Sequence, residues 1–361
     1  MFLDGFSLNE FRSFGAEQTD IGPLRKINFF IGQNNSGKSN ILMFVKRFLS
    51  SAIQALRSSQ VLVLEQGQLD WHLQMEGVST VGVALQIGGQ TYQTILERAH
   101  AALTRDQAEW PERILKSQAL TKGTGMAWFY YRAGQSAATL KTLIDQVAAE
   151  HVLGHNEWAE FFTKATKKQG GDIKGNWIPE VLHFLSPVQL QMPTVELIPA
   201  VRKIGAPESS ATDYSGEGII QRLAELQHPS FQQYHLQSDF DRINEFLRVV
   251  TGRKDSKIEI PNKRDMILVH MEQKMLPLAS LGTGIHEVIM LAAAATLCRS
   301  QIVCIEEPEL HLHPLLQKQL CRYLSKETNN QYLITTHSSH ILDAEDASIF
   351  FVQNNEGKID R

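Results

Sequence analysis

A glycine-bearing segment near the start of the chain has the residue types needed to hold a chain of phosphates. Residues 32–39 follow the pattern G-x-x-x-x-G-K-S. Glycines let backbone N–H groups curl around phosphates, Lys38 brings a positive charge to the β- and γ-phosphates, and the Ser39 hydroxyl can ligate Mg²⁺. A helix expected to open near Ser39 adds its dipole. The predicted nucleotide-binding residues are Gly32, Asn34, Asn35, Ser36, Gly37, Lys38, Ser39 and Asn40.

Two acidic residues end a short apolar run late in the chain. Residues 302–305 have the length and composition of a buried strand, and Glu306 and Glu307 follow directly. A buried strand carries such side chains to the edge of a sheet. There Glu306 can hold Mg²⁺ through its hydration shell, and Glu307 can orient or deprotonate an attacking water. A solvated turn is the alternative for a pair of acids, and the phosphate-binding pattern makes that alternative the weaker one.

Two further segments offer contacts to phosphate. The sequence Ser-Leu-Gly-Thr-Gly directly precedes an apolar helical stretch, so Ser280, Gly282 and Gly284 can form an anion site at a helix N-terminus. Taken alone, an ordinary capping loop explains that segment better. His337 ends another apolar run, where a neutral imidazole can contact a γ-phosphate or the attacking water. A lone histidine is usually structural, and the strand-end position that it shares with Glu307 is what makes it a candidate.

The segments that position these residues alternate between strand and helix. Apolar strands are expected at residues 27–31, 302–305, 332–334 and 349–352, and helices at 285–298 and 315–325. Apolar strands that alternate with helices indicate a largely parallel sheet covered on both faces. The predicted fold class is therefore α/β.

Shorter patterns complete the expected organisation. Alternation over residues 81–87, followed by Gly88-Gly89 and then Tyr92 and Ile95, predicts a β-hairpin. Further strands are expected at 181–185, 195–198, 258–260 and 266–270. The chain is expected to divide into an N-terminal part (1–96), a mainly helical insertion (97–176) and a C-terminal part (177–361).

Composition excludes several classes of protein. Of the 361 residues, 43% are hydrophobic and 20% charged, as is typical of a globular chain with an ample core. The 35 basic and 39 acidic residues give a formal charge of −4, which excludes a generally basic nucleic-acid coat. No apolar run reaches the roughly 18 residues of a membrane helix, so we expect no membrane partner. The three cysteines, Cys298, Cys304 and Cys321, lack metal-type spacing and indicate reduced thiols in a cytoplasmic protein.

Together the motifs resemble the ATPase head of ABC-type proteins. In that family residues 32–39 correspond to the Walker A motif, 280–284 to the signature, 302–307 to Walker B, and His337 to the switch histidine. The opening sequence Phe-Ser-Leu-Asn-Glu-Phe-Arg-Ser-Phe is similar to that of the RecF, SMC and OLD-type branch, in which the arginine approaches the nucleotide. This resemblance adds Arg12 to the nucleotide-binding residues. It also implies an antiparallel β lobe beside the parallel sheet.

Several details are similar to the OLD-like ATPases of prokaryotic anti-phage systems such as OLD, Septu and PARIS. These are Glu-Glu-Pro-Glu at 306–309, Leu-His-Pro at 312–314, Thr-Thr-His-Ser at 335–338 and Tyr-Ser-Gly-Glu-Gly at 214–218. Two departures stand out. Glu306 replaces the usual aspartate, and the signature reads S-L-G-T-G in place of L-S-G-G-Q, which leaves open which hydroxyl meets phosphate. The glutamine of the Q-loop stays open between Gln189 and Gln191.

The resemblance implies ATP and Mg²⁺ as cofactors and ATP hydrolysis as the activity. Lys38, Glu307 and His337 are then catalytic, and Ser39 and Glu306 are the metal ligands. Two copies are expected to sandwich ATP, with Lys38 of one copy facing residues 280–284 of the other. Some OLD-family proteins carry a C-terminal Toprim nuclease. The 24 residues after His337 are expected to be too few for one, so either that domain has been removed from this chain or the effector is a separate protein. The leading expectation is a sensor or regulatory subunit that controls a separate effector, a nuclease.

Other functions stay open. One is a DNA-repair or chromosome-maintenance ATPase of the RecF/SMC type, although the 97–176 insertion is too short for long coiled-coil arms. Another is a nucleotide-gated scaffold without turnover, and a transporter subunit is the least favoured. DNA stays an open partner because of two basic clusters, although charge runs are usually solvated faces. The clusters are Arg253, Lys254, Lys257, Lys263 and Arg264, and Lys164, Lys167, Lys168 and Lys174.

Overall fold

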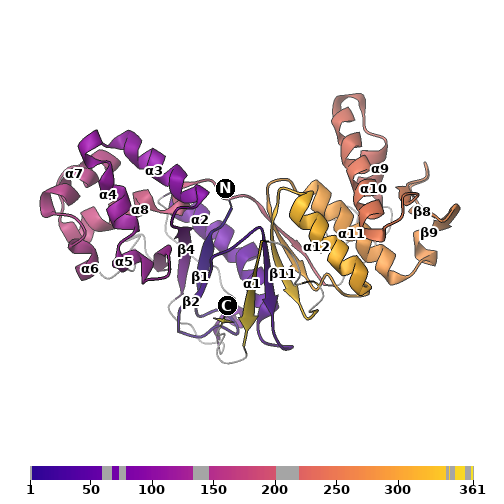
Figure 1. Cartoon of the computed structure of the whole chain (residues 1–361), viewed down its shortest axis with the longest axis horizontal. Coiled ribbons are helices and arrows are strands. Elements are labelled where there is room, and N and C mark those ends of the chain that lie inside the picture. Colours follow the sequence, from indigo (N-terminus) through magenta and orange to yellow (C-terminus); the bar gives the residue numbers. More distant parts are fainter. Residues whose placement is uncertain are drawn as a thin grey trace. The chain divides into compact units, whose positions relative to one another are not determined.

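Figure 1 shows the computed structural model of the chain. The structure describes residues 2–58, 67–72, 79–132, 146–200, 219–338, 341, 346–353 and 359–360, so the motif at 214–218 lies outside the described residues. The chain divides into two compact units. The first consists of Met1–Leu24, Asn34–Pro193 and Val352–Asp360, and the second of Arg25–Gln33 and Thr194–Phe351.

A parallel sheet forms the centre of the second unit. Five strands lie in the order β12-β3-β11-β10-β6, and every neighbouring pair is parallel. A smaller antiparallel sheet has the order β7-β8-β9. The strands are β3 (Ile27–Ile31), β6 (Val195–Ile198), β7 (Lys257–Glu259), β8 (Leu268–Met271), β9 (Lys274–Pro277), β10 (Ile302–Glu306), β11 (Gln331–Thr336) and β12 (Ala347–Val352). The helices are α9 (Ile219–Gln227), α10 (Gln237–Thr251), α11 (Thr283–Leu297) and α12 (Pro314–Lys326).

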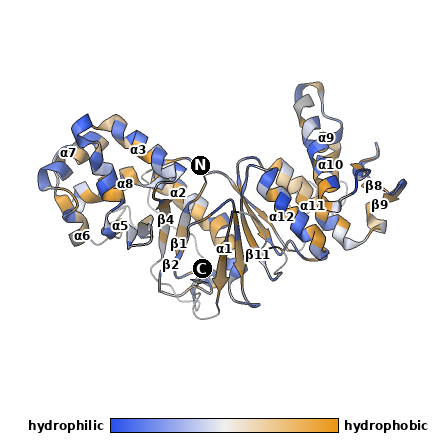
Figure 2. Cartoon of the chain, in the orientation of Figure 1, coloured by the Kyte–Doolittle hydropathy of each residue, from blue (hydrophilic) through white to orange (hydrophobic). Residues whose placement is uncertain are grey.

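The core of the second unit explains why its central strands are apolar. Side chains of β3, β10 and β11 share one hydrophobic cluster with α10, α11 and α12. Helix α11 is buried without interruption from Glu287 to Thr296, and its four consecutive alanines allow close packing. Helix α12 buries only one face, and Figure 2 shows hydrophilic residues on its visible side. The predicted helices at 285–298 and 315–325 and the predicted strands at 27–31, 195–198, 302–305, 332–334 and 349–352 are confirmed.

The first unit combines an antiparallel sheet with helices. The sheet has the order β2-β1-β4-β5, with β1 (Gly5–Leu8), β2 (Thr19–Ile21), β4 (Thr80–Gln86) and β5 (Met126–Arg132). The helices are α1 (Lys38–Phe44), α2 (Ser50–Arg57), α3 (Gln90–Ala102), α4 (Glu109–Leu115), α5 (Gln118–Thr121), α6 (Gln146–Glu150), α7 (His155–Thr166) and α8 (Ile178–Leu185). Strand β13 (Ile359–Asp360) also belongs to this unit. The predicted fold class, α/β with a helix-flanked parallel sheet and an antiparallel β lobe, is confirmed.

Two predicted elements are wrong. The hairpin expected around Gly88-Gly89 is absent from the described residues, because Gly89 caps α3 and Tyr92 and Ile95 lie on its buried face. Strand β4 pairs with β1 and with β5 instead. The strand expected at 181–185 is part of α8, whose buried residues recur at a spacing of three or four. Strand β5 lies within the stretch predicted as a mainly helical insertion, and the predicted division at 97 and 176 stays a prediction.

Two expectations from composition concern thiols and membranes. All three cysteines are buried free thiols. Within the described ranges, no helix has both the length and the apolar character needed to cross a bilayer.

A buried histidine makes the stability of the first unit sensitive to acid. His183 of α8 lies against the edge of the Tyr131 ring, and its Nε2 atom is 2.7 Å from Nε2 of Gln189. Burial lowers the pKa of His183 below its ordinary value. As the pH falls below about 6.5, His183 takes up a proton in the unfolded chain but not in the folded chain. The free energy of unfolding therefore decreases.

We predict that His183→Gln removes part of this acid sensitivity, because glutamine does not take up a proton. The free energy of unfolding in urea, measured at neutral and at mildly acidic pH, should fall less for the variant than for the wild type. His151→Gln, at an exposed position of the same unit, is the matched control. Equal losses on acidification in the wild type and His183→Gln would contradict the prediction.

Candidate active site

The phosphate loop enters α1 through a glycine that no other residue can replace without strain. Gly37 caps α1 with φ 103° and ψ 5°, in the left-handed region. A Cβ atom added there would lie 2.2 Å from Oγ of Ser13. The same Oγ accepts a hydrogen bond from Nδ2 of Asn40 at 3.0 Å. The glycine of the G-K-S pattern is therefore fixed by both backbone conformation and packing.

Side chains of the phosphate loop differ in their exposure. Ser36 and Lys38 are buried, at 1% and 6% relative exposure, whereas Asn34, Asn35 and Ser39 are exposed. The Oγ atom of Ser36 is buried and has no hydrogen-bond partner among the described atoms. Buried hydroxyls are rarely left unsatisfied, so this atom marks a place where a ligand oxygen or a water is expected.

Arg12 lies in a tight turn that aromatic packing holds against α1. Backbone N–H groups of Phe11 and Phe14 donate to each other's carbonyl oxygens at 3.0 and 2.9 Å, and Arg12 between them has φ 52°. The Phe11 ring meets the rings of Phe44 and Phe48 edge-on, with centroids 5.5 and 5.3 Å away. The turn is thereby anchored on the helix that opens at Lys38.

A buried aspartate fixes the Arg12 side chain. Oδ1 of Asp70 accepts from Nε and Nη2 of Arg12 at 2.9 and 2.7 Å, and Oδ2 lies 3.4 Å from Nη1 of Arg47. Arg12 also donates from Nη1 to Oδ1 of Asn40 at 3.4 Å. The structure thus brings Arg12 beside Asn40, two of the predicted nucleotide-binding residues. Asp70 was not predicted from the sequence, because it is 58 positions from Arg12 and belongs to no motif.

We predict that Asp70→Asn destabilises the first unit by about 1–3 kcal/mol, because two arginines then share a site without their buried counter-charge. Urea unfolding followed by tryptophan fluorescence measures the loss. Asp106→Asn, which changes an exposed aspartate of the same unit, should have little effect. Equal unfolding midpoints for Asp70→Asn and the wild type would refute the role given to Asp70.

In the second unit, the predicted metal ligand Glu306 lies at the end of β10. Glu306 is the last residue of β10 and lies opposite Thr335 of β11 in the parallel register. Its Oε2 atom accepts a hydrogen bond from the backbone N–H of Ala200 at 3.2 Å. A carboxylate held at the carboxyl edge of a parallel sheet suits the oxygen-ligand chemistry of Mg²⁺.

The two predicted catalytic residues at the strand ends meet. Oε1 of Glu307 lies 3.3 Å from Nε2 of His337, and both side chains are about one-third exposed. The backbone N–H of Glu307 donates to the carbonyl oxygen of Thr335 at 2.9 Å. Glu307 itself has φ 42°, an uncommon conformation for a residue with a side chain and one that clusters at functional sites. The structure thus brings together Glu307 and His337, and their catalytic roles stay a prediction.

The predicted anion site at the start of α11 is exposed, and one of its glycines has a packing role. Ser280 and Gly282 are exposed, and Gly282 caps the helix. A Cβ atom added at Gly284 would lie 2.8 Å from the carbonyl oxygen of His311. Gly284 is therefore required for close contact between α11 and the segment after β10, whatever its role toward an anion.

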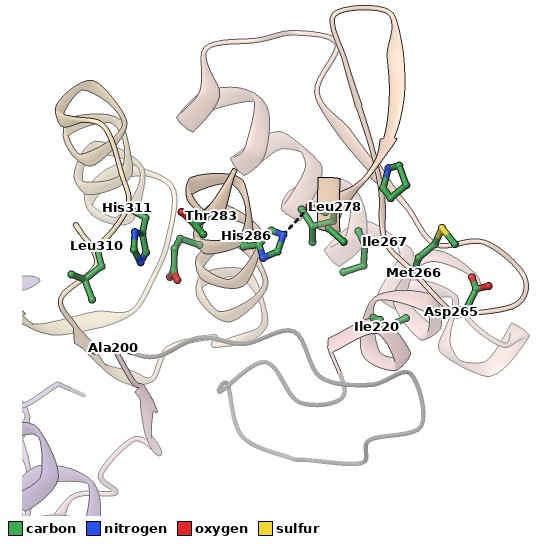
Figure 3. Close-up of a pocket in the computed structure, with 13 residues that line it drawn as sticks. Ala200, Ile220, Asp265, Met266, Ile267, Leu278, Thr283, His286, Leu310 and His311 are labelled. Carbon is green, nitrogen blue, oxygen red and sulfur yellow. Dashed lines mark hydrogen bonds between the residues drawn. The ribbon is translucent and has the colours of Figure 1, made fainter. Parts of the chain in front are cut away.

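A cavity of about 660 Å³ lies beside this contact. Figure 3 shows that α11 lines it with Thr283 and His286. Leu310 and His311 line it from the segment after β10, and Nε2 of His286 contacts the carbonyl oxygen of Leu278 at 2.8 Å. The cavity is thus lined by residues of two segments, the predicted signature segment and the segment that follows Glu307.

Comparisons with known proteins give a family match and several similar solved structures. Residues 192–342 match the family described as AAA ATPase domain (AAA_15). The crystal structure of an Smc head bound to the C-winged helix domain of ScpA has a TM-score of 0.51 and 13% identity, covering 99% of this chain and 97% of the other. An Smc head with an extended coiled coil, bound to the C-terminal domain of ScpA from Pyrococcus furiosus, has a TM-score of 0.46 and 13% identity, with 99% and 95% covered. The SMC head domain from Thermotoga maritima has a TM-score of 0.43 and 13% identity, with 100% and 98% covered.

No curated protein matches the chain. The likeness to the first Smc head shows the fold of this chain, and the family match indicates an AAA-type ATPase domain over residues 192–342.

Proposed function

We propose that the protein binds and hydrolyses ATP as an ABC-type ATPase. The observation that carries this proposal is the contact between Glu307 and His337 at the ends of two neighbouring parallel strands, with Oε1 and Nε2 3.3 Å apart. A carboxylate and an imidazole at this distance can align and deprotonate one water. The match of residues 192–342 to an AAA ATPase domain supports the same activity.

The residues of the phosphate loop fit a bound triphosphate. The buried Oγ of Ser36 needs a hydrogen-bond partner, and Gly37 holds the left-handed turn that the loop requires. We propose that Lys38 contacts the β- and γ-phosphates and that the side chain of Arg12, held by Asp70, approaches the nucleotide. Mg²⁺, when bound, would supply positive charge that offsets the negative charge of the phosphates. The Ser39 hydroxyl and the Glu306 carboxylate would hold it.

Glu307 acts as the base in the proposed reaction. It accepts a proton from the attacking water while the water oxygen bonds to the γ-phosphorus and the bond to the bridging oxygen of ADP breaks. His337 contacts the carboxylate of Glu307. In the proposed reaction this contact keeps the carboxylate and the attacking water in line with the γ-phosphate. The products are ADP and inorganic phosphate.

The proposed working unit is a pair of chains around two ATP molecules. The loop of Ser280 and Gly282 at the start of α11 is exposed, and we propose that it is an anion site that serves the nucleotide of the second copy. The OLD-like motifs of the sequence support a more specific biological role than ATP hydrolysis alone. We propose a sensor or regulatory subunit of an anti-phage system that controls a separate effector, a nuclease. An operon neighbour that encodes a nuclease would support this role, and a repair operon would count against it.

The likeness to an Smc head favours a second candidate, an ATPase that acts on DNA in repair or chromosome maintenance. Exposed basic residues of the second unit, Lys254, Lys257, Lys263 and Arg264, would supply the phosphate contacts. Stimulation of ATP turnover by duplex DNA that disappears as salt is raised would favour this candidate over the defence role.

We predict that Lys38→Ala abolishes nucleotide binding, because the triphosphate loses its main positive charge. Isothermal titration calorimetry with ATP and Mg²⁺ measures the change. Lys116→Ala, at the exposed lysine that caps the C-terminus of α4, is the control and should bind like the wild type. Unchanged affinity in Lys38→Ala would rule out the phosphate loop as the ATP site.

We predict that Glu307→Gln retains ATP binding but releases phosphate at least 100-fold more slowly, in the range expected for loss of a general base. The amide keeps the shape of the side chain and cannot take the proton. Glu259→Gln is the matched control, since it alters a second Glu–His pair of the same unit, 2.9 Å from Oε2 to Nε2 of His270. Full-rate phosphate release by Glu307→Gln would remove Glu307 from the mechanism.

A further inference from the structure

Glu309 lies two residues beyond the proposed base and has no part in the proposed reaction. Its Oε1 atom accepts a hydrogen bond from the backbone N–H of His337 at 2.6 Å. Its Oε2 atom is buried without a hydrogen-bond partner among the described atoms. A partly buried carboxylate is costly to keep, and among the described residues this one accepts a hydrogen bond only from His337, the residue that contacts the proposed base.

The position of His337 in the chain explains why such a contact matters. The parallel ladder between β11 and β3 ends at Thr336, opposite Ile31, so His337 is the first residue beyond it. Its N–H would otherwise lack the partner that a strand supplies. A carboxylate acceptor is also about twice as strong as a neutral one. Glu309 therefore holds the backbone of His337 at the point where the sheet ceases to do so.

A second hydrogen bond ties the next residue to the same region. Oγ of Ser338 donates to Oε1 of Gln317 at 2.6 Å, and Nε2 of Gln317 donates to the carbonyl oxygen of Leu312 at 2.8 Å. The residues after β11 are thus attached at two points to the chain after β10. Of these two attachments, only the one from Glu309 reaches His337 itself.

We infer that Glu309 is a positioning residue, which fixes the backbone of His337 so that the imidazole stays against Oε1 of Glu307. This inference rests on the proposed ATPase function. Glu309 touches neither water nor phosphate in this role and acts only through His337. Its loss should lower the rate of hydrolysis and leave nucleotide binding unchanged.

The first test compares Glu309→Ala with Glu309→Gln. Glu309→Ala should lower kcat about tenfold, the effect of losing one hydrogen bond to a charged group, with KM for ATP unchanged. Glu309→Gln keeps an acceptor oxygen and should recover most of the rate. In a His337→Ala background, Glu309→Ala should cause no further loss, because residues that act as one unit are not additive. Glu259→Gln is the control for removing a carboxylate from a Glu–His pair.

A second measurement does not depend on activity. The side-chain resonances of His337, assigned by their loss in His337→Gln, should shift in Glu309→Ala and stay in place in Glu259→Gln. Unshifted resonances in Glu309→Ala would overturn the inference even if the wild type hydrolyses no ATP. Equal losses of kcat in the wild-type and His337→Ala backgrounds would also overturn it. A wild type without turnover but with the shift contradicts the proposed function and leaves the positioning contact standing.

Discussion

Parallel pairing of β10 with β11 is the constraint on which the proposed chemistry depends. Because Glu306 lies opposite Thr335, the chain leaves both strands at the same edge of the sheet. The N–H of Glu307 continues the ladder by one bond to Thr335, and the left-handed backbone at Glu307 then turns the chain. His337 leaves β11 one residue beyond its last paired position and meets the Glu307 carboxylate. A shift of register by one residue would send one of the two side chains to the opposite face of the sheet.

In the first unit, different interactions hold the predicted nucleotide-binding residue Arg12 in place. Aromatic rings and not a strand ladder fix the turn that carries Arg12, since Phe11 packs against Phe44 and Phe48 of the helical stretch after the phosphate loop. Asp70 then holds the guanidinium. Gly37 completes this arrangement, because any side chain there would displace Ser13. The sequence motif and the packing around it thus require the same residue for separate reasons.

Sequence alone predicted the elements whose signal is carried by unbroken apolar runs, and it failed where short windows fitted both a strand and a helix. The central strands β3, β10 and β11 are buried on both faces, so their unbroken hydrophobic runs were recognisable. Gly88-Gly89 suits a hairpin turn and a helix start equally well, and only the later spacing of Tyr92, Ile95 and Leu96 favours the helix. At 181–185 the window was too short to show the helical period that begins at Ile178.

Residues that support the site were harder to predict than those that form it. Glu307, His337 and the phosphate loop have recognisable motifs. Asp70 acts on Arg12 across 58 positions, and no local pattern indicates a contact of that separation. Glu309 was visible in the Glu-Glu-Pro-Glu sequence, but its hydrogen bond to the backbone of His337 depends on the packing of two strands. The packing role of Gly284 against His311 is of the same kind.

The proposed cycle requires two chains, because the exposed loop at the start of α11 is assigned to the nucleotide of a second copy. Light scattering of the purified protein, with saturating Mg²⁺ and a non-hydrolysable ATP analogue, tests this requirement directly. The expected result is a mass of two copies, or a multiple of two, that reverts when the nucleotide is removed. A mass of one copy of 40.6 kDa under saturating analogue would contradict the proposed cycle.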